Sequence, residues 1–138
     1  LPMTTHMYDQ VRQFRLKMGL PVAESPTMLQ PEQTSYFARF IMEELSEYLK
    51  ACEEVSIVDA ADALGDLVYI TLGCALAMGL PFEKIFDAIH TANMGKVPAN
   101  QNLRSVRGRQ YDVVKPAGWQ PPEPAIKDAI NKAWDEHL

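Results

Sequence analysis

The sequence predicts an all-α fold, namely an antiparallel four-helix-type bundle with a short C-terminal helix. Apolar residues recur at spacings of three and four, Gly and Pro separate these stretches, and no stretch alternates apolar with polar residues. The 138 residues fit one domain, residues 1–138, because a single core usually holds about 100–200 residues. A hydrophobic content of 47% is enough to bury that core and excludes an intrinsically disordered chain.

The first expected helix carries an apolar stripe at helical spacing, formed by Met7, Val11, Phe14 and Met18. Tyr8 and Arg15 lie beside this stripe. The helix ends at Met18-Gly19-Leu20-Pro21, and the same four residues recur at 78–81. In both places glycine can adopt the left-handed conformation that ends a helix, and proline prevents its continuation. We therefore expect two helix ends with the same capping structure.

Two longer helices are expected in the middle of the chain. Residues 21–31 contain three prolines and predict a loop, so the second helix runs from about 32 to 51. Its broad apolar stripe consists of Tyr36, Phe37, Phe40, Ile41, Leu45, Tyr48 and Leu49. The third helix is expected from Ser56 to Met78, because Ser56 and Asp59 have the spacing of a capping box. Its length makes it the central helix.

The last third of the chain is expected to be mostly irregular. A fourth helix is predicted from Pro81 to near Asn93, since proline is favoured in a first turn. Residues 97–123 then lose helical periodicity and contain six glycines and prolines, which predicts an irregular basic tail segment. A short helix over about 124–137 closes the chain.

The charges of the two signs are separated along the chain. The net charge of −5 argues against a broad nucleic-acid-binding face, so we expect no nucleic-acid partner. Eight acidic residues accompany one lysine over residues 43–66, whereas five basic residues accompany one acid over 96–115. Without an apolar run of about 18 residues or a leader, we expect a cytoplasmic protein with no membrane partner. Cys52 and Cys74 are too far apart to predict a metal pair or a disulfide framework.

Five carboxylates on the two central helices are candidate metal ligands: Glu43, Glu44, Glu47, Asp62 and Asp66. Their spacings put each group on one helical edge, and antiparallel packing would bring the two groups together. Hard divalent cations, chiefly Mg²⁺, would then compensate the repulsion. The alternative is a solvated helix face, the usual place of a Glu-rich stretch. A di-iron bundle is disfavoured, because it needs two Glu-x-x-His motifs and only Asp87-Ala88-Ile89-His90 comes near.

At these residues the sequence resembles the MazG-like all-α nucleoside triphosphate pyrophosphohydrolases, a superfamily that includes dimeric dUTPases and phosphoribosyl-ATP pyrophosphohydrolases. The superfamily's Glu-Glu-x-x-Glu motif is similar to residues 43–47, and its following acidic pair is similar to residues 62–66. Residues 90–96 resemble its His-x-x-Asn-x-x-Lys stretch, and Lys115-Pro116-Ala117-Gly118-Trp119 resembles the tail of short bacterial and phage members. One departure is Ala63, where many members have glutamate. Asp62 would either replace that ligand or hold a metal-associated water.

The resemblance implies hydrolysis of a nucleoside triphosphate between its α and β phosphates, with Mg²⁺ as cofactor, Mn²⁺ as a substitute and two or more ions per site. Glu43 and Glu47 are the candidate catalytic residues among the five ligands. Glu47 would hold a catalytic ion, and Glu43 would either orient or deprotonate the attacking water or hold a second ion. The candidate substrate-binding residues are Asn93, Lys96, Arg109, Lys115 and Trp119. The cations among them would bind the outer phosphates, whereas Asn93 is nearly as well suited to capping its helix.

Two classes of function follow. The first is a Mg²⁺-dependent (d)NTP diphosphatase acting on nucleotide pools, favouring a purine such as dGTP, with dUTP as the alternative. The second is a non-enzymatic helical module that senses nucleotides or binds a partner, which the intact Glu-Glu-x-x-Glu set disfavours. Because the helix over 56–78 is apolar on two faces, we also expect a homodimer or homotetramer, with the basic tail completing the nucleotide pocket.

Overall fold

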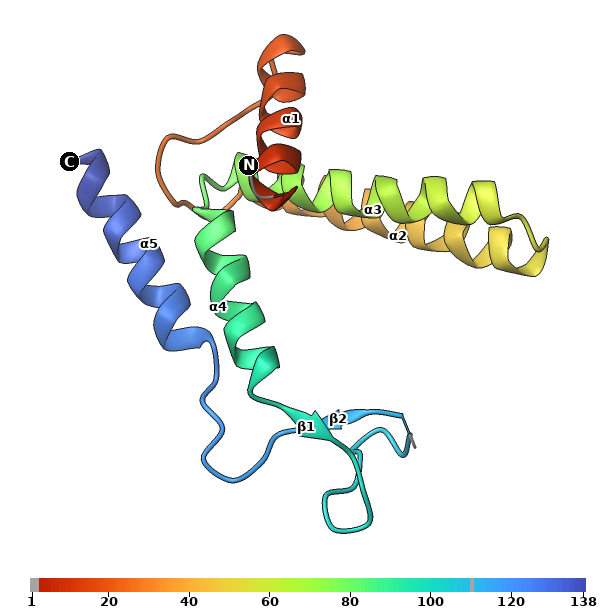
Figure 1. Ribbon diagram of the computed structural model, residues 1–138. Coiled ribbons are helices and arrows are strands. Elements are labelled where there is room, and N and C mark those ends of the chain that lie inside the picture. Colours follow the sequence, from red (N-terminus) through yellow and green to blue (C-terminus); the bar gives the residue numbers. More distant parts are fainter. Residues whose placement is uncertain (1–2, 110) are drawn as a thin grey trace.

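The computed structural model describes residues 3–109 and 111–138, and it confirms the all-α class. The described chain contains five helices: α1 (Met3–Lys17), α2 (Pro31–Glu53), α3 (Ile57–Ala77), α4 (Phe82–Met94) and α5 (Glu123–His137) (Figure 1). Two short strands, β1 (Val97–Pro98) and β2 (Val113–Val114), pair antiparallel within the segment expected to be irregular. The helices form packed pairs, and the single chain does not close into one bundle.

The predicted helix ends are confirmed. The backbone N–H of Leu20 donates to the carbonyl of Arg15 at 2.8 Å, and that of Leu80 donates to Ala75 at 3.0 Å, as expected where a left-handed glycine precedes each leucine. Gly79 is required for a second reason, because a Cβ there would collide with the backbone of Ser25. At the start of α3 the hydroxyl of Ser56 accepts the N–H of Asp59 at 3.2 Å.

Helices α2 and α3 form an antiparallel hairpin, which extends from the rest of the chain as one arm (Figure 1). Phe37, Ile70 and Ala77 are buried where the hairpin joins the rest of the fold, with Leu29, Phe40, Ile41 and Cys74 packed against them. Ala63 is buried farther along the pair at 2% exposure. This small residue allows the two helices to approach closely at the level of the acidic residues.

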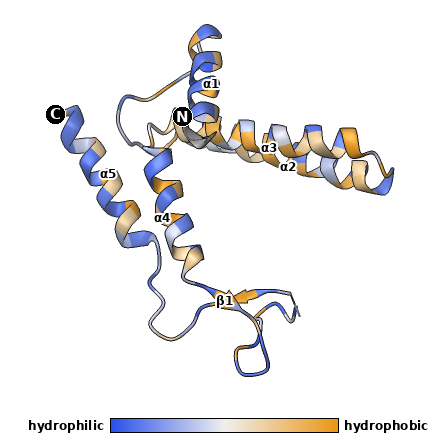
Figure 2. Cartoon of the chain, viewed as in Figure 1, coloured by the Kyte–Doolittle hydropathy of each residue, from blue (hydrophilic) through white to orange (hydrophobic). Residues whose placement is uncertain are grey.

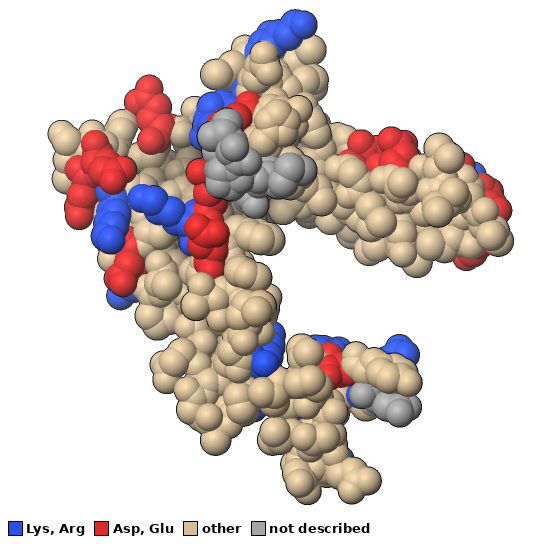
Figure 3. Space-filling model, in the orientation of Figure 1, with Lys and Arg blue, Asp and Glu red and all other residues tan. Residues whose placement is uncertain are grey.

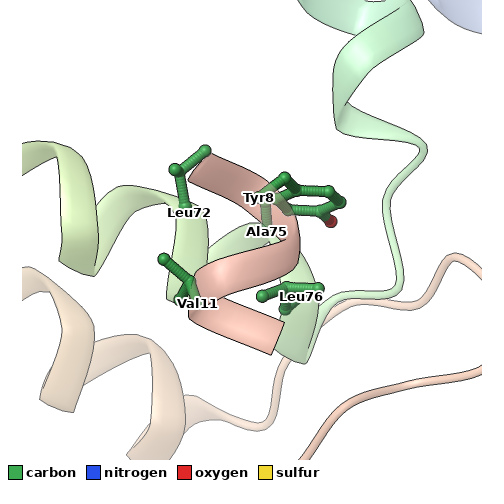
Figure 4. Packing of buried hydrophobic residues seen from close by; sticks show 5 residues of the cluster. All are labelled: Tyr8, Val11, Leu72, Ala75 and Leu76. Carbon is green, nitrogen blue, oxygen red and sulfur yellow. The ribbon is translucent and has the colours of Figure 1, made fainter. Parts of the chain in front are cut away.

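Helix α1 packs against α3 through the cluster formed by Tyr8, Val11, Leu72, Ala75 and Leu76 (Figure 4). The buried face of α1 differs from the expected stripe, because Tyr8, Val11 and Arg15 are buried whereas Met7, Phe14 and Met18 are exposed. Two polar contacts favour this rotation. The Tyr8 hydroxyl donates to the carbonyl of Leu80 at 2.7 Å, and Arg15 Nε donates to that of Pro21 at 2.9 Å. The apolar parts of both side chains can therefore be buried while their polar groups are hydrogen-bonded.

Helices α4 and α5 pack on each other and form the second arm together with the strands and their connecting loops (Figure 1). The indole N–H of Trp134 on α5 donates to the carbonyl of Pro26 at 2.8 Å, which ties the C-terminal helix to the loop after α1. Helix α4 ends at Met94, and its C-cap is Gly95, so Asn93 does not cap it.

Hydrophobic residues follow the hairpin along its length (Figure 2), and five large apolar side chains between its two ends are exposed. They are Met42, Leu45, Leu49, Leu64 and Val68, each at least 47% exposed. Monomers rarely expose a contiguous apolar face of this kind.

Within the described part of the chain, α3 has the length and hydropathy of a membrane span. A core helix meets the same two criteria. Helix α3 packs against α1 and α2 and carries Asp62 and Asp66, and aspartates within a membrane are costly. Length and composition alone therefore do not place it in a membrane.

Candidate active site

The α2/α3 hairpin brings three of the five predicted ligands together. Carboxylate oxygens of Glu44, Glu47 and Asp66 lie within 4.8 Å of one another. Glu44 and Glu47 are three residues apart, which places them one turn from each other on α2. The antiparallel α3 supplies Asp66 from the opposite side. The convergence expected from the spacing therefore exists for this acidic cluster.

Glu44 is the buried member of the acidic cluster, at 9% exposure. Its Oε2 atom has no hydrogen-bond partner in the described chain. Desolvation by burial raises its pKa to about 7, with further contributions from a hydrogen bond to Glu47 and from the charges of Glu47, Asp66 and Asp62. A buried oxygen without a partner is energetically costly. Three hard oxygen donors and one unpartnered oxygen are the donor set that fits Mg²⁺.

Glu43 and Asp62 lie outside the acidic cluster. Glu43 is exposed and lines a groove of 520 Å³ on α2 together with Tyr36 and Arg39. Asp62 is exposed and affects the cluster through its charge, whereas the neighbouring Ala63 is buried against α2. Asp62 thus does not occupy the same place as a glutamate at position 63 would. The ligand or catalytic roles of Glu43 and Asp62 remain predictions.

Two of the basic residues expected to bind substrate converge on Trp119. Lys115 Nζ lies 4.8 Å from the centroid of the indole ring, and Lys96 Nζ lies 5.7 Å from it. The indole N–H donates to the carbonyl of Ala92 at 2.7 Å, which fixes the ring against the end of α4. Lys96, Lys115 and Trp119 form a group that we call the lysine–tryptophan clamp. Its lysines are far apart in sequence but are held together by one aromatic ring.

The remaining predicted substrate-binding residues are not part of the clamp. Arg109 is exposed and, with Arg104, lines a pocket of 680 Å³ in the loop between the strands. Arg107 forms an ion pair with Asp112, whose pKa is held well below its usual range by hydrogen bonds from Arg107 and Ser105. This ion pair favours a role for Arg107 in stabilising the loop over a role in binding substrate. Asn93 is exposed on α4.

The acidic cluster and the basic residues of the tail lie on different arms of the chain. Figure 1 shows the α2/α3 hairpin and the β1/β2 region extending away from α1 in different directions. In Figure 3 acidic side chains gather on the hairpin, whereas basic side chains lie on the lower arm across an open space. One chain therefore does not bring the predicted metal ligands and the predicted phosphate-binding residues together.

A pocket beside the acidic cluster was not anticipated from the sequence. It has a volume of 260 Å³ between α1, α2 and α3, and it is lined by Phe14, Arg15, Tyr36, Phe40, Asp66 and Tyr69 among others. Asp66 lines this pocket and also belongs to the acidic cluster. The sequence feature that could have indicated this pocket is Arg15. It lies one helical turn after the buried Val11 and therefore on the inner face of α1.

The fold and the acidic cluster define an all-α pyrophosphohydrolase of the MazG-like superfamily. The sequence model described as phosphoribosyl-ATP pyrophosphohydrolase matches residues 11–93, which is more than half of the chain. The chain belongs to this family, whose members are hydrolases that act on phosphoric anhydrides of nucleotide-type substrates. A comparison with curated proteins returns no match. Family membership decides against the non-enzymatic helical module.

Proposed function

We propose that the protein is a Mg²⁺-dependent (d)NTP diphosphatase that releases pyrophosphate and a nucleoside monophosphate. The observation that carries the proposal is the acidic cluster, in which Glu44 is buried beside two further carboxylates with one oxygen unpartnered. Such a site repels a polyanionic substrate unless cations are bound to it. The family's pyrophosphohydrolase activity supplies the reaction class.

Glu44, Glu47 and Asp66 would hold the cation, with Mn²⁺ as a substitute for Mg²⁺. When bound, such a cation neutralises phosphate oxygens and supports the attack of water on phosphorus. Glu43 is exposed on the same helix as two of these ligands. It would orient or deprotonate the attacking water, or hold a second ion together with the exposed Asp62.

The basic residues would bind the phosphates that leave as pyrophosphate. Lys96 and Lys115 present two positive charges at one place, the clamp, and Trp119 holds them there. Arg109 is an exposed cation in the loop between the strands, and Asn93 is exposed near the end of α4. Asn93 offers both a donor and an acceptor to the sugar or the base.

A second copy of the chain would complete the site. The exposed apolar face of the hairpin favours a homodimer or homotetramer, because self-association would bury it. The same association would supply a basic arm to the acidic cluster, which its own arm does not reach (Figure 3). A cytoplasmic location also stays a prediction.

Among substrates we favour a purine deoxynucleotide such as dGTP, with dUTP as the alternative. Phosphoribosyl-ATP is a further candidate, because the matching family model carries its name. All three carry a triphosphate chain, so the acidic cluster does not distinguish them.

The test is to measure product release from single nucleotides with and without Mg²⁺. The panel contains the four common dNTPs, dUTP, GTP, ATP and phosphoribosyl-ATP. We expect pyrophosphate and a monophosphate only when Mg²⁺ or Mn²⁺ is present. Release of inorganic phosphate and a diphosphate would contradict cleavage between the α and β phosphates. Undiminished turnover in excess EDTA would contradict the metal requirement.

A further inference from the structure

The pocket between α1, α2 and α3 combines aromatic walls with one buried cation. Phe14, Tyr36, Phe40 and Tyr69 contribute the rings, and Arg15 contributes the charge. The rings are held by one another, since Phe14 and Tyr69 meet edge to face at 5.6 Å between centroids and Tyr36 and Phe40 meet similarly at 6.0 Å. A flat aromatic ligand is the chemistry that such walls favour.

Arg15 is only 7% exposed, yet most of its donors have no partner. Its Nε donates to the carbonyl of Pro21, and its guanidinium lies 5.6 Å from the centroid of Phe37. Over residues 3–109 and 111–138 no carboxylate lies within ion-pair distance of it, and its terminal NH₂ groups make no hydrogen bond. Burial lowers the pKa of this guanidinium from its ordinary value. Arg15 therefore offers its terminal N–H groups, which have no protein partner among the described residues, to a ligand with acceptors in this pocket.

Both the phosphates and the base of a nucleotide carry hydrogen-bond acceptors. The aromatic walls of the pocket favour the base. Aromatic walls would remove water from a phosphate without replacing its hydrogen bonds, which is costly. The same walls can stack on a base. An arginine binds the O6 and N7 acceptors of guanine with two parallel hydrogen bonds. Adenine offers N7 beside a donor, and the two carbonyl oxygens of uracil are separated by the N3–H donor, so neither matches the guanidinium as well.

We infer that this pocket binds the base of the substrate and that Arg15 reads the O6 and N7 edge of guanine. The inference rests on the proposed function, because Asp66 lines the pocket and also belongs to the acidic cluster. A base in this pocket would therefore place its triphosphate beside the three carboxylates. Arg15 would make the protein selective for dGTP or GTP over adenine and uracil nucleotides.

The test compares kcat/KM for dGTP, 7-deaza-dGTP and dATP in the wild type, in Arg15→Lys and in the control Arg12→Lys. Arg12 lies on the same helix, pairs with Asp9 and does not line this pocket. In the wild type we expect dGTP to exceed the other two by about tenfold or more. In Arg15→Lys the preference should shrink to about threefold or less, because lysine donates as a point charge rather than as a fork. Arg12→Lys should retain the wild-type ratio.

A second variant covers the case in which Arg15→Lys fails to fold, as judged by circular dichroism. A Cβ on Gly73 would lie 3.4 Å from Arg15 Nη1, which is ordinary contact, so Gly73→Ala should fold while its methyl group enters the pocket. Its KM for dGTP should rise at least about fivefold because the base loses space. An unchanged KM would overturn the assignment of the base to this pocket.

Failure of this inference can be separated from failure of the proposed function. Equal losses for all three nucleotides in Arg15→Lys, or no preference for dGTP in the wild type, would assign Arg15 a structural role only. If the wild type hydrolyses no triphosphate, calorimetric titration with dGMP and dAMP still tests the pocket. Binding of dGMP at least about tenfold tighter than dAMP, lost in Arg15→Lys, supports it, whereas equal affinities overturn it.

Discussion

The two arms of the molecule satisfy their charges in opposite ways. On the α2/α3 hairpin, Glu44, Glu47 and Asp66 are held together by regular packed helices, and they repel one another. On the other arm, three cations have partners nearby, since Arg107 has Asp112 and the two clamp lysines have Trp119. Among the described residues, the carboxylates of the cluster thus have no protein counter-ion, whereas Arg107 and the clamp lysines have partners within their own arm.

This difference predicts different consequences for substitutions in the two arms. The three carboxylates of the acidic cluster lie within 4.8 Å of one another around the buried Glu44, so their charges interact strongly, whereas the exposed charges of the basic arm are weakened by solvent and salt. Changes in the acidic cluster should therefore abolish the reaction. Changes in the basic arm should mainly weaken binding and should be sensitive to ionic strength.

The largest expected effect is that of Glu47→Gln. This variant removes one charge from the acidic cluster but keeps the shape, so the fold should remain and kcat should fall at least on the order of a hundredfold. Steady-state pyrophosphate release at saturating Mg²⁺ measures it. Glu53→Gln is the matched control, since Glu53 is an exposed residue at the end of the same helix. Full activity of Glu47→Gln would show that the reaction does not need the Glu47 carboxylate.

The basic arm gives the next largest effect. Lys115→Ala should raise KM by roughly tenfold, because it removes one charged contact to phosphate, and added salt should reduce the difference. Lys127→Ala, on α5 and outside the clamp, should leave KM unchanged. An unchanged KM in Lys115→Ala would show that Lys115 of the clamp does not bind phosphate.

Mixing variants of the two arms tests whether one subunit supplies the clamp to another. At a substrate concentration near the wild-type KM, Glu47→Gln and the double variant Lys96→Ala/Lys115→Ala should each be nearly inactive alone. After unfolding and refolding together, about a quarter of the wild-type activity should return, because half of the dimers then contain one intact site. No recovery in proven heterodimers would show that both arms of one site belong to the same chain.

The buried Glu44 predicts an unusual dependence of stability on pH. Its folded pKa of about 7 lies above the ordinary value of 4.5, so its stabilising contribution is complete below pH 4.5 and is lost as pH rises through 7. Without divalent cations, Tm should fall by at least about 5 °C between pH 5 and pH 8. Saturating Mg²⁺ should restore Tm at pH 8 by binding the charged form. Glu44→Gln should lack this pH dependence, and the same fall in that variant would assign it to other groups.

The smallest effect concerns the tip of the hairpin. Val55 has a φ of 53°, which is unfavourable for a β-branched residue, and its side chain is exposed. Val55→Gly should raise Tm by about 2–5 °C without changing kcat. Val58→Gly, also an exposed position but in the first turn of α3, should lower Tm slightly instead, because glycine is a poorer helix former than valine. A lower Tm in Val55→Gly would show that the turn is not strained.

Local signals in the sequence determined the helices and the five carboxylates from which the acidic cluster is drawn. The Met-Gly-Leu-Pro repeats and Ser56 placed helix ends correctly, because capping depends on a few neighbouring residues. The i and i+3 spacing of Glu44 and Glu47 fixed their common edge, because helical geometry does so in any helix. The same reasoning could not rank the five carboxylates, since their burial depends on where α3 crosses α2.

Tertiary structure alone decided the rest. The rotation of α1 buries Arg15 rather than Phe14, because α3, α4 and the following loop together determine which face is covered. The same packing creates the aromatic pocket beside Asp66 and separates the hairpin from the basic arm. Sequence periodicity reports which side chains share a face of one helix. Only the packing of several helices determines what that face meets, because burial and charge pairing are properties of the whole fold.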